Sequence, residues 1–131
     1  MGFQAALAAH PPNGFSSAST VRIRGAPWAG QAAYEDWYLV HDMTALGTLN
    51  AAAVSGPRLE PHNAVARLAA GGTAGLYGLR LGAPLASPLH SAWFGKPPGM
   101  RYPALFELVG PLVTDAGGGF WMRPMVLGPT P

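Results

Sequence analysis

A histidine and a carboxylate stand side by side at the end of a predicted strand, where loop residues can reach a binding site. His41 and Asp42 directly follow the segment Tyr34–Val40, and a histidine beside a carboxylate can act as a general base. Neighbouring residues at a strand end tend to point apart, however. Asp42 is also a good N-cap for the helix predicted after it. A helix cap and a surface histidine are therefore the structural alternative, and the sequence favours that alternative.

Two arginines interrupt predicted strands that are otherwise apolar. Arg80 is expected on the opposite side of its strand from Tyr77, Leu79 and Leu81, and Arg123 lies within the last predicted strand. A buried arginine needs a partner, because an unpaired buried charge is costly. The carboxylates of Glu35 and Asp36, on a neighbouring strand segment, are the expected partners of Arg80, which makes a structural ion pair or a rim charge the simpler reading.

The functional reading of these arginines is a pocket in which a guanidinium orients a carboxylate or enol ligand between two tryptophans. Its candidate ligand-binding residues are Trp37, Arg80 and Trp93, and its weak candidate catalytic residues are His41 and Arg123. The alternative is that the tryptophans serve only the core and an interface, which is the commoner use of such side chains.

Several chemistries find no support in the residues. The chain has no cysteine and four histidines, none of which is spaced from another like a pair of metal ligands. The runs Gly71–Gly72 and Gly117–Gly119 lack the pattern of a phosphate-binding loop, and no nucleophile elbow occurs. We therefore expect no metal and no cofactor.

Composition narrows the partners and the location. Of the 131 residues 49% are hydrophobic and 11% charged, and the net charge of +2 comes from scattered cations. Nucleic-acid binding needs clustered cations, so no nucleic-acid partner is expected. No apolar stretch reaches the ~18 residues of a membrane span, and the N-terminus lacks a basic signal region, which predicts a cytoplasmic protein without a membrane partner. The excess of arginine, alanine, glycine and proline is typical of a GC-rich bacterial genome.

Periodicity and turn residues predict the elements. Proline, glycine and serine make 11–19 a loop, and Pro124 indicates an edge or a bulge in the last strand. The expected helices are Phe3–His10, a helix from Asp42 to Gly56, a second helical piece from Pro61 to Gly71–Gly72, and one opening at Pro103. The expected strands are Thr20–Gly25, Tyr34–Val40, Gly75–Leu81, His90–Lys96 and Phe120–Leu127.

From residue 34 onward these elements follow the order β-α-β-β-α-β. This order predicts an α+β fold with a ferredoxin-like antiparallel sheet of four strands and both helices on one face. We expect one domain over 1–131, with a ferredoxin-like unit at 33–131 and an N-terminal helix and strand at 1–32 as an extension.

The predicted strands are apolar on both faces, which is unusual for a sheet covered by helices on one face only. Trp37 and Leu39 point one way, while Tyr38 and Val40 point the other. Leaving such a face bare would expose more apolar surface than soluble monomers usually do. A homodimer with two sheets packed face to face is therefore expected. The alternative is that the N-terminal helix covers the face within one chain.

The element order over residues 34–131 resembles the dimeric α+β barrel superfamily, although no diagnostic motif carries the resemblance. The superfamily includes cofactor-free monooxygenases, isomerases, haem-handling enzymes and uncharacterised bacterial proteins, and a shared fold does not by itself fix function. The resemblance implies a small homodimer, and the binding of a small apolar or acidic ligand is expected because the chain has a good core, few polar groups and no catalytic constellation. The alternatives are a cofactor-independent monooxygenase or isomerase, and a purely structural interaction module.

A weak internal repeat is also present. At one constant offset Phe3 falls on Tyr102, Pro12 on Pro111 and Arg24 on Arg123. A true repeat would imply that a strand equivalent to His90–Lys96 is missing before Met1, through a misassigned start codon or a genuine loss. Chance similarity is the competing explanation.

Overall fold

The chain has an α+β fold in a computed structural model that describes residues 2–25, 33–84 and 90–127. The described residues form four α-helices, one short 3-10 helix and two antiparallel sheets of two strands each. In chain order the elements are α1 (Phe3–Ala9), β1 (Phe15–Ile23), β2 (Ala33–Val40), α2 (Met43–Ala53), η1 (Gly56–Arg58), α3 (Leu59–Ala66), β3 (Gly75–Gly82), α4 (Tyr102–Asp115) and β4 (Gly119–Val126).

The elements divide into two compact units, Met1–Gly72 and Thr73–Thr130, which we call unit 1 and unit 2. The boundary between the units lies in the glycine-rich stretch between α3 and β3, and stretches of this composition commonly separate compact units. Unit 1 holds the sheet β1–β2 and unit 2 holds the sheet β3–β4. The single domain expected over 1–131 stays a prediction.

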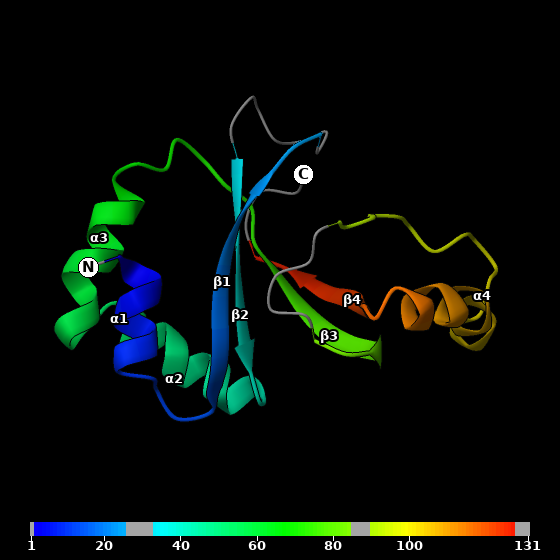
Figure 1. The fold of residues 1–131 in the computed structure, drawn as a ribbon, viewed down its shortest axis with the longest axis horizontal. Helices are drawn as coiled ribbons and strands as arrows, with labels where there is room; N and C mark the ends of the chain where they lie inside the picture. Colours follow the sequence, from blue (N-terminus) through cyan, green and yellow to red (C-terminus); the bar gives the residue numbers. More distant parts are fainter. Residues whose placement is uncertain (1, 26–32, 85–89, 128–131) are drawn as a thin grey trace. The chain divides into compact units, whose positions relative to one another are not determined.

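Unit 1 is a long pair of antiparallel strands with α1 and α2 packed on it and α3 packed on α1. Thr20 pairs with Asp36 and Ala18 with Tyr38, and each pair shares one face of the hairpin. Helix α1 packs on β1, and α1 and α3 lie side by side (Figure 1). The core consists of the buried side chains Ala6, Leu7, Ala45 and Leu49. Helices α1 and α2 therefore supply the buried centre of this unit.

The start of α2 is fixed by a capping residue and by a close approach of the backbone. The carboxylate of Asp42 accepts a hydrogen bond from the backbone N–H of Ala45 at 2.8 Å, which confirms the predicted N-cap. Gly14 precedes β1 with a φ of 76°, and a Cβ on it would collide with the side chain of Ala45. Only glycine fits where β1 passes the first turn of α2.

The regular elements of unit 2 are one antiparallel pair of strands, β3 and β4, and helix α4, which lies between them in the chain and packs on both. Strands β3 and β4 pair antiparallel, with Gly82 opposite Gly119 and Gly75 opposite Val126. Pro103 lies in the first turn of α4, where its missing N–H costs no hydrogen bond. Leu105 of α4 is buried, at 4% exposure, and it forms the centre of this smaller core.

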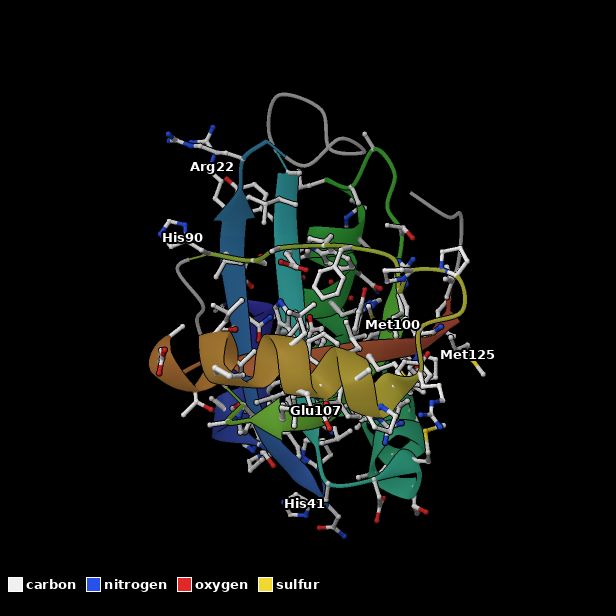
Figure 2. All side chains as sticks on the ribbon, turned by 90° about the vertical axis from the view of Figure 1, so that its right-hand side faces the viewer. Arg22, His41, His90, Met100, Glu107 and Met125 are labelled. Atoms are coloured by element: carbon white, nitrogen blue, oxygen red, sulfur yellow. The ribbon has the colours of Figure 1, made fainter. Side chains whose placement is uncertain are left out.

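The predicted helices and strands are confirmed in part. Helix α1 and strands β2, β3 and β4 lie within one or two residues of their predicted bounds, and Val21 and Ile23 are less exposed than Arg22 and Arg24, as alternation predicted. Figure 2 shows Arg22 near the end of β1 with its side chain directed away from the strands. The sequence also favours a turn at 26–33 and a proline-rich connection at 82–89, of which residues 26–32 and 85–89 lie outside the described residues.

Two predicted boundaries in unit 1 are wrong. Strand β1 begins at Phe15 inside the predicted loop 11–19, because its polar residues pair with the aromatic strand β2. The second helical piece begins at Leu59 rather than Pro61 and ends at Ala66, well before Gly71–Gly72. Pro61 still lies in the first turn, where the backbone N–H has no helical partner to lose.

The predicted strand His90–Lys96 is also wrong, because this described segment has no regular secondary structure. Its aromatic residues pack rings instead of pairing backbone: Trp93 lies edge-on to Tyr77 at 5.8 Å, and Phe94 lies 5.9 Å from Phe120. A glycine before Lys96 and two prolines after it oppose a regular strand. The described residues thus form two separate pairs of antiparallel strands, with helices, rather than one four-stranded sheet.

The two regions aligned by the weak repeat have the same local order. The offset that places Phe3 on Tyr102 also aligns the first residues of α1 and α4, and each helix is followed by a strand, β1 or β4. The helices differ in length, with 7 and 14 residues.

Candidate ligand-binding site

Both strand arginines of unit 2 lie at irregularities of the β3–β4 pairing. Leu79 pairs with Trp121 and Leu81 with Phe120, so Arg80 is an extra residue on β3. Such a bulge bends the strand and redirects a side chain, and bulges are common next to binding sites. The bulge therefore turns the Arg80 side chain away from the direction that it would have in a regularly alternating strand.

The second irregularity of the β3–β4 pairing lies at Pro124, the residue that indicated an edge or a bulge in the last strand. Leu76 pairs with Met125 and Gly78 with Met122, so Arg123 and Pro124 together oppose the single residue Tyr77. Proline cannot donate to a strand ladder, which explains why the extra residue is accommodated here. The predicted edge or bulge at Pro124 is confirmed.

A pocket of about 230 Å³ opens beside the first bulge, lined by Arg80, Tyr102, Phe106 and Met122. One lining residue comes from β3, one from β4 and two from α4. Tyr102 and Phe106 are one helical turn apart, so both face the same side of α4. Three of the four lining residues present rings or a thioether, and Arg80 provides the charge.

The aromatic wall of the pocket is continuous with the core of unit 2. The ring of Phe106 lies 5.9 Å from that of Tyr102 and 5.8 Å from that of Phe120. Phe94, from the irregular segment before α4, extends the stack beyond Phe120. Aromatic pairs at these separations are favourable beyond the area they bury, so the wall is held in shape by several rings.

A second cation lies against the same wall. The ammonium of Lys96 stands 5.5 Å from the centre of the Tyr102 ring, within the range of a cation–π interaction. It also donates hydrogen bonds to the carbonyl oxygens of Met100 at 2.6 Å and Pro97 at 3.4 Å. This lysine is thereby held in one place on the ring.

Arg123 serves a different set of aromatic residues. Its guanidinium lies 5.8 Å from the centre of the Trp93 ring, and Trp93 in turn packs on Tyr77. A Cβ on Gly75 would lie 2.9 Å from both the Arg123 side chain and the Tyr77 ring, so the two pack closely over that glycine. Arg123 does not line the pocket beside Arg80.

The net positive charge of the chain belongs to unit 2. Residues 73–130 carry four cations, Arg80, Lys96, Arg101 and Arg123, against two acids, Glu107 and Asp115, whereas the cations and acids of residues 1–72 balance. No acid occurs between Glu60 and Glu107. An anion approaching the pocket is therefore attracted by the local field.

The structure places the predicted site residues at different points. His41 is exposed at the end of β2 (Figure 2), and its neighbour Asp42 is occupied as the cap of α2. Trp37 belongs to unit 1, whereas Arg80 and Trp93 belong to unit 2. A site between Trp37 and Trp93 would span the two units, as would an ion pair of Arg80 with Glu35 or Asp36. Both stay predictions.

The side chain of Arg80 is exposed at the pocket, so it has no burial cost that a partner would have to offset. The bulge accounts for this exposure, since an extra residue in a strand is turned out of the regular face. The pocket residues that sequence reasoning missed are Tyr102, Phe106 and Met122, with Lys96 beside them. The spacing of Tyr102 and Phe106 at i and i+4 on a predicted helix was a usable signal.

Residues 2–25, 33–84 and 90–127 contain no group of three or more metal-binding side chains. Over the same ranges, no helix combines the length and apolar character required to cross a membrane.

Unit 1 contains a polar cluster that ties α1 to the hairpin. The Gln4 side-chain amide donates to Thr20 Oγ1 at 3.1 Å and to Tyr38 Oη at 3.3 Å, and Thr20 donates to the Asp36 carboxylate at 2.5 Å. Burial raises the pKa of Tyr38 to about 12, and the neighbouring Asp36 carboxylate reinforces the shift. The phenol therefore stays protonated at neutral pH, and the cluster has a structural role.

The raised pKa of Tyr38 predicts a loss of stability at alkaline pH. The folded phenol holds its proton up to about pH 12, whereas the unfolded phenol releases it near its ordinary pKa of 10.0. The free energy of unfolding should therefore fall as the pH rises from 10 to 12, because the folded state binds more protons. Urea unfolding at several pH values measures this slope. The Tyr38→Phe variant should show a shallower slope, and an unchanged slope would contradict the assignment.

The chain was compared with known proteins, and no family model, curated protein or solved structure matches it. The candidate site therefore rests on the residues and geometry described above.

Proposed function

We propose that this chain binds a small ligand with an apolar body and an anionic group in the pocket of unit 2. The observation that carries the proposal is the position of Arg80 at a pocket otherwise lined by Tyr102, Phe106 and Met122. A guanidinium can grip a carboxylate with two parallel hydrogen bonds, while the rings contact the apolar part of the ligand.

The size of the pocket limits the ligand. Its volume is about 230 Å³, below the roughly 300–1,000 Å³ that is typical of drug-sized ligands. A single substituted ring or a short branched acid is of suitable size. A nucleotide or a haem is too large to be enclosed by these residues.

The residues that line the pocket also indicate whether the pocket only binds a ligand or catalyses a reaction. None of the four lining residues is a histidine or a carboxylate, which are the commonest general bases. Binding is therefore the role that this pocket supports best. A cofactor-independent monooxygenase or isomerase, and a purely structural interaction module, are the alternatives, and no contact within 73–84 and 90–127 favours either.

Benzoate is a suitable probe because it combines one ring with one carboxylate, and benzamide is its neutral counterpart of nearly equal shape. Titration calorimetry of the full chain should show benzoate binding with a dissociation constant on the order of 1 mM, as expected for so small a ligand. Benzamide should bind at least about ten-fold more weakly, since a neutral amide forms no charge-assisted pair with Arg80. Equal affinity for the two probes, or no binding of benzoate, would contradict the proposal.

A homodimer with a ferredoxin-like, barrel-forming arrangement of the strands is proposed as the assembled state, in the cytoplasm. Two exposed leucines one turn apart on α4 support association of two copies, although not the face-to-face packing of the sheets: Leu108 is 63% and Leu112 is 69% exposed. Exposed apolar stripes of this kind often mark interfaces. Sedimentation of the chain at micromolar concentration should give twice the monomer mass of 13.6 kDa, and a clean monomer would contradict the dimer.

A further inference from the structure

We propose that Lys96 is a second anion-binding residue of the pocket, so that the preferred ligands are small dianions on an apolar framework. This inference rests on the proposed function, because it concerns the same pocket. The ring of Tyr102 carries it: Tyr102 lines the pocket with Arg80, and the Lys96 ammonium lies against that same ring. Two cations therefore adjoin one aromatic wall.

The position of Lys96 is unusually well defined for an exposed lysine. Its Nζ donates to the carbonyl oxygens of Met100 and Pro97, and its charge faces the Tyr102 ring. An ammonium has three N–H donors, so one remains for a ligand. A lysine that is already ordered loses less side-chain entropy when it binds an anion than a freely moving one.

The segment that carries Lys96 is itself anchored on both sides. Trp93 packs on Tyr77 and Phe94 on Phe120 before it, and Tyr102 begins α4 after it. These contacts hold the irregular chain 93–102 against strands β3 and β4 and the start of α4. The absence of a strand at His90–Lys96 thus has a consequence for the site, because a loop can place an ammonium on a ring that a paired strand could not reach.

Neither cation is neutralised by a carboxylate. Within residues 73–84 and 90–127, Arg80 and Lys96 form no ion pair, and the acid nearest to Lys96 along the chain is Glu107 on α4. Arg80 lines the pocket with Tyr102, and Lys96 lies on the ring of Tyr102, so a dianion long enough to reach both cations gains contacts with each. A monoanion can satisfy only one of them.

The test compares benzoate with the three benzene dicarboxylates, phthalate, isophthalate and terephthalate, whose carboxylates differ in separation. The wild-type chain should bind at least one dicarboxylate about five-fold more tightly than benzoate, as an additional exposed ion pair allows. Lys96→Gln should abolish this preference, so that the variant binds no dicarboxylate more tightly than it binds benzoate. Lys96→Arg, which keeps the charge over the ring, should retain it.

Arg101→Gln is the matched control for net charge. Arg101 directly precedes Tyr102 and is exposed, so this variant removes the same charge from the same segment without removing the cation on the ring. The dicarboxylate preference should survive in Arg101→Gln. If benzoate binds but no dicarboxylate binds more tightly, or if both variants lose the preference equally, the role of Lys96 is refuted while the proposed function stands. If benzoate does not bind at all, the proposed function itself fails.

Discussion

Replacing Gly82 by alanine is expected to destabilise unit 2 by about 2–5 kcal/mol, because two separate penalties add at this position. The first is conformational: Gly82 has a φ of 75°, a region that an L-residue with a Cβ rarely adopts. The second is steric: a Cβ would collide with the carbonyl oxygen of Gly118 and lie 2.8 Å from Cγ1 of Val113. That carbonyl also accepts the hydrogen bond of Ala83 N–H, so it cannot move freely.

Urea unfolding of Gly82→Ala, followed by tryptophan fluorescence and by the methionine methyl signals of β4, measures this loss. Gly78→Ala is the matched control, since it lies in the same strand and a Cβ there meets no atom within 4 Å. It should unfold at nearly the wild-type urea concentration. A wild-type midpoint for Gly82→Ala would show that the end of β3 is not built as described.

Arg80→Gln is expected to weaken benzoate binding about ten-fold, because the charge-assisted pair with the carboxylate is lost. Glutamine keeps a polar side chain of intermediate length, so the apolar wall of Tyr102, Phe106 and Met122 should remain. Benzamide affinity should therefore change little. Calorimetric titration of both probes separates the loss of charge from a loss of the pocket.

Two further variants sharpen the result for Arg80. Arg80→Lys should bind benzoate with intermediate affinity, because an ammonium keeps the charge but lacks the fork that contacts both carboxylate oxygens. Arg67→Gln removes the same charge from unit 1 and should have little effect on either probe. Equal weakening in Arg80→Gln and Arg67→Gln would mean that only net charge matters.

Much of the local structure could be predicted because single residues determine it. The side chain of Asp42 caps α2, and Pro103 opens α4, both as their types and positions predict. Pro124 indicated a bulge, and the strand pairing shows one there. These signals act within one turn or one strand, so they are independent of the rest of the fold.

The errors arose where a segment's structure depends on a distant partner. The residues at 15–19 are mostly polar and small, and they form a strand because β2 pairs with them. His90–Lys96 has the aromatic content of a strand, but Trp93 and Phe94 pack on Tyr77 and Phe120 instead. Propensity gives way to such tertiary contacts, which alternation alone cannot reveal.

Of the residues that line the candidate site, only the charged residue Arg80 was predicted from the sequence. Arg80 stood out as a cation in an apolar strand, but the bulge that exposes it follows from the register of β3 and β4. The aromatic wall on α4 and the ammonium of Lys96 come from segments that lie more than ten residues later in the chain. Only the packing of α4 and the preceding segment on the strands brings these groups together.

The pocket of unit 2 is tested most directly by methionine methyl NMR during a benzoate titration. Met122 lines the pocket, whereas Met125 lies on β4 outside it and Met43 belongs to unit 1. A benzoate ring against Tyr102 and Phe106 should shift the Met122 methyl signal in a saturable way and leave those of Met43 and Met125 nearly unchanged. An unchanged Met122 signal, or equal shifts of all three, would contradict a ligand site at this pocket.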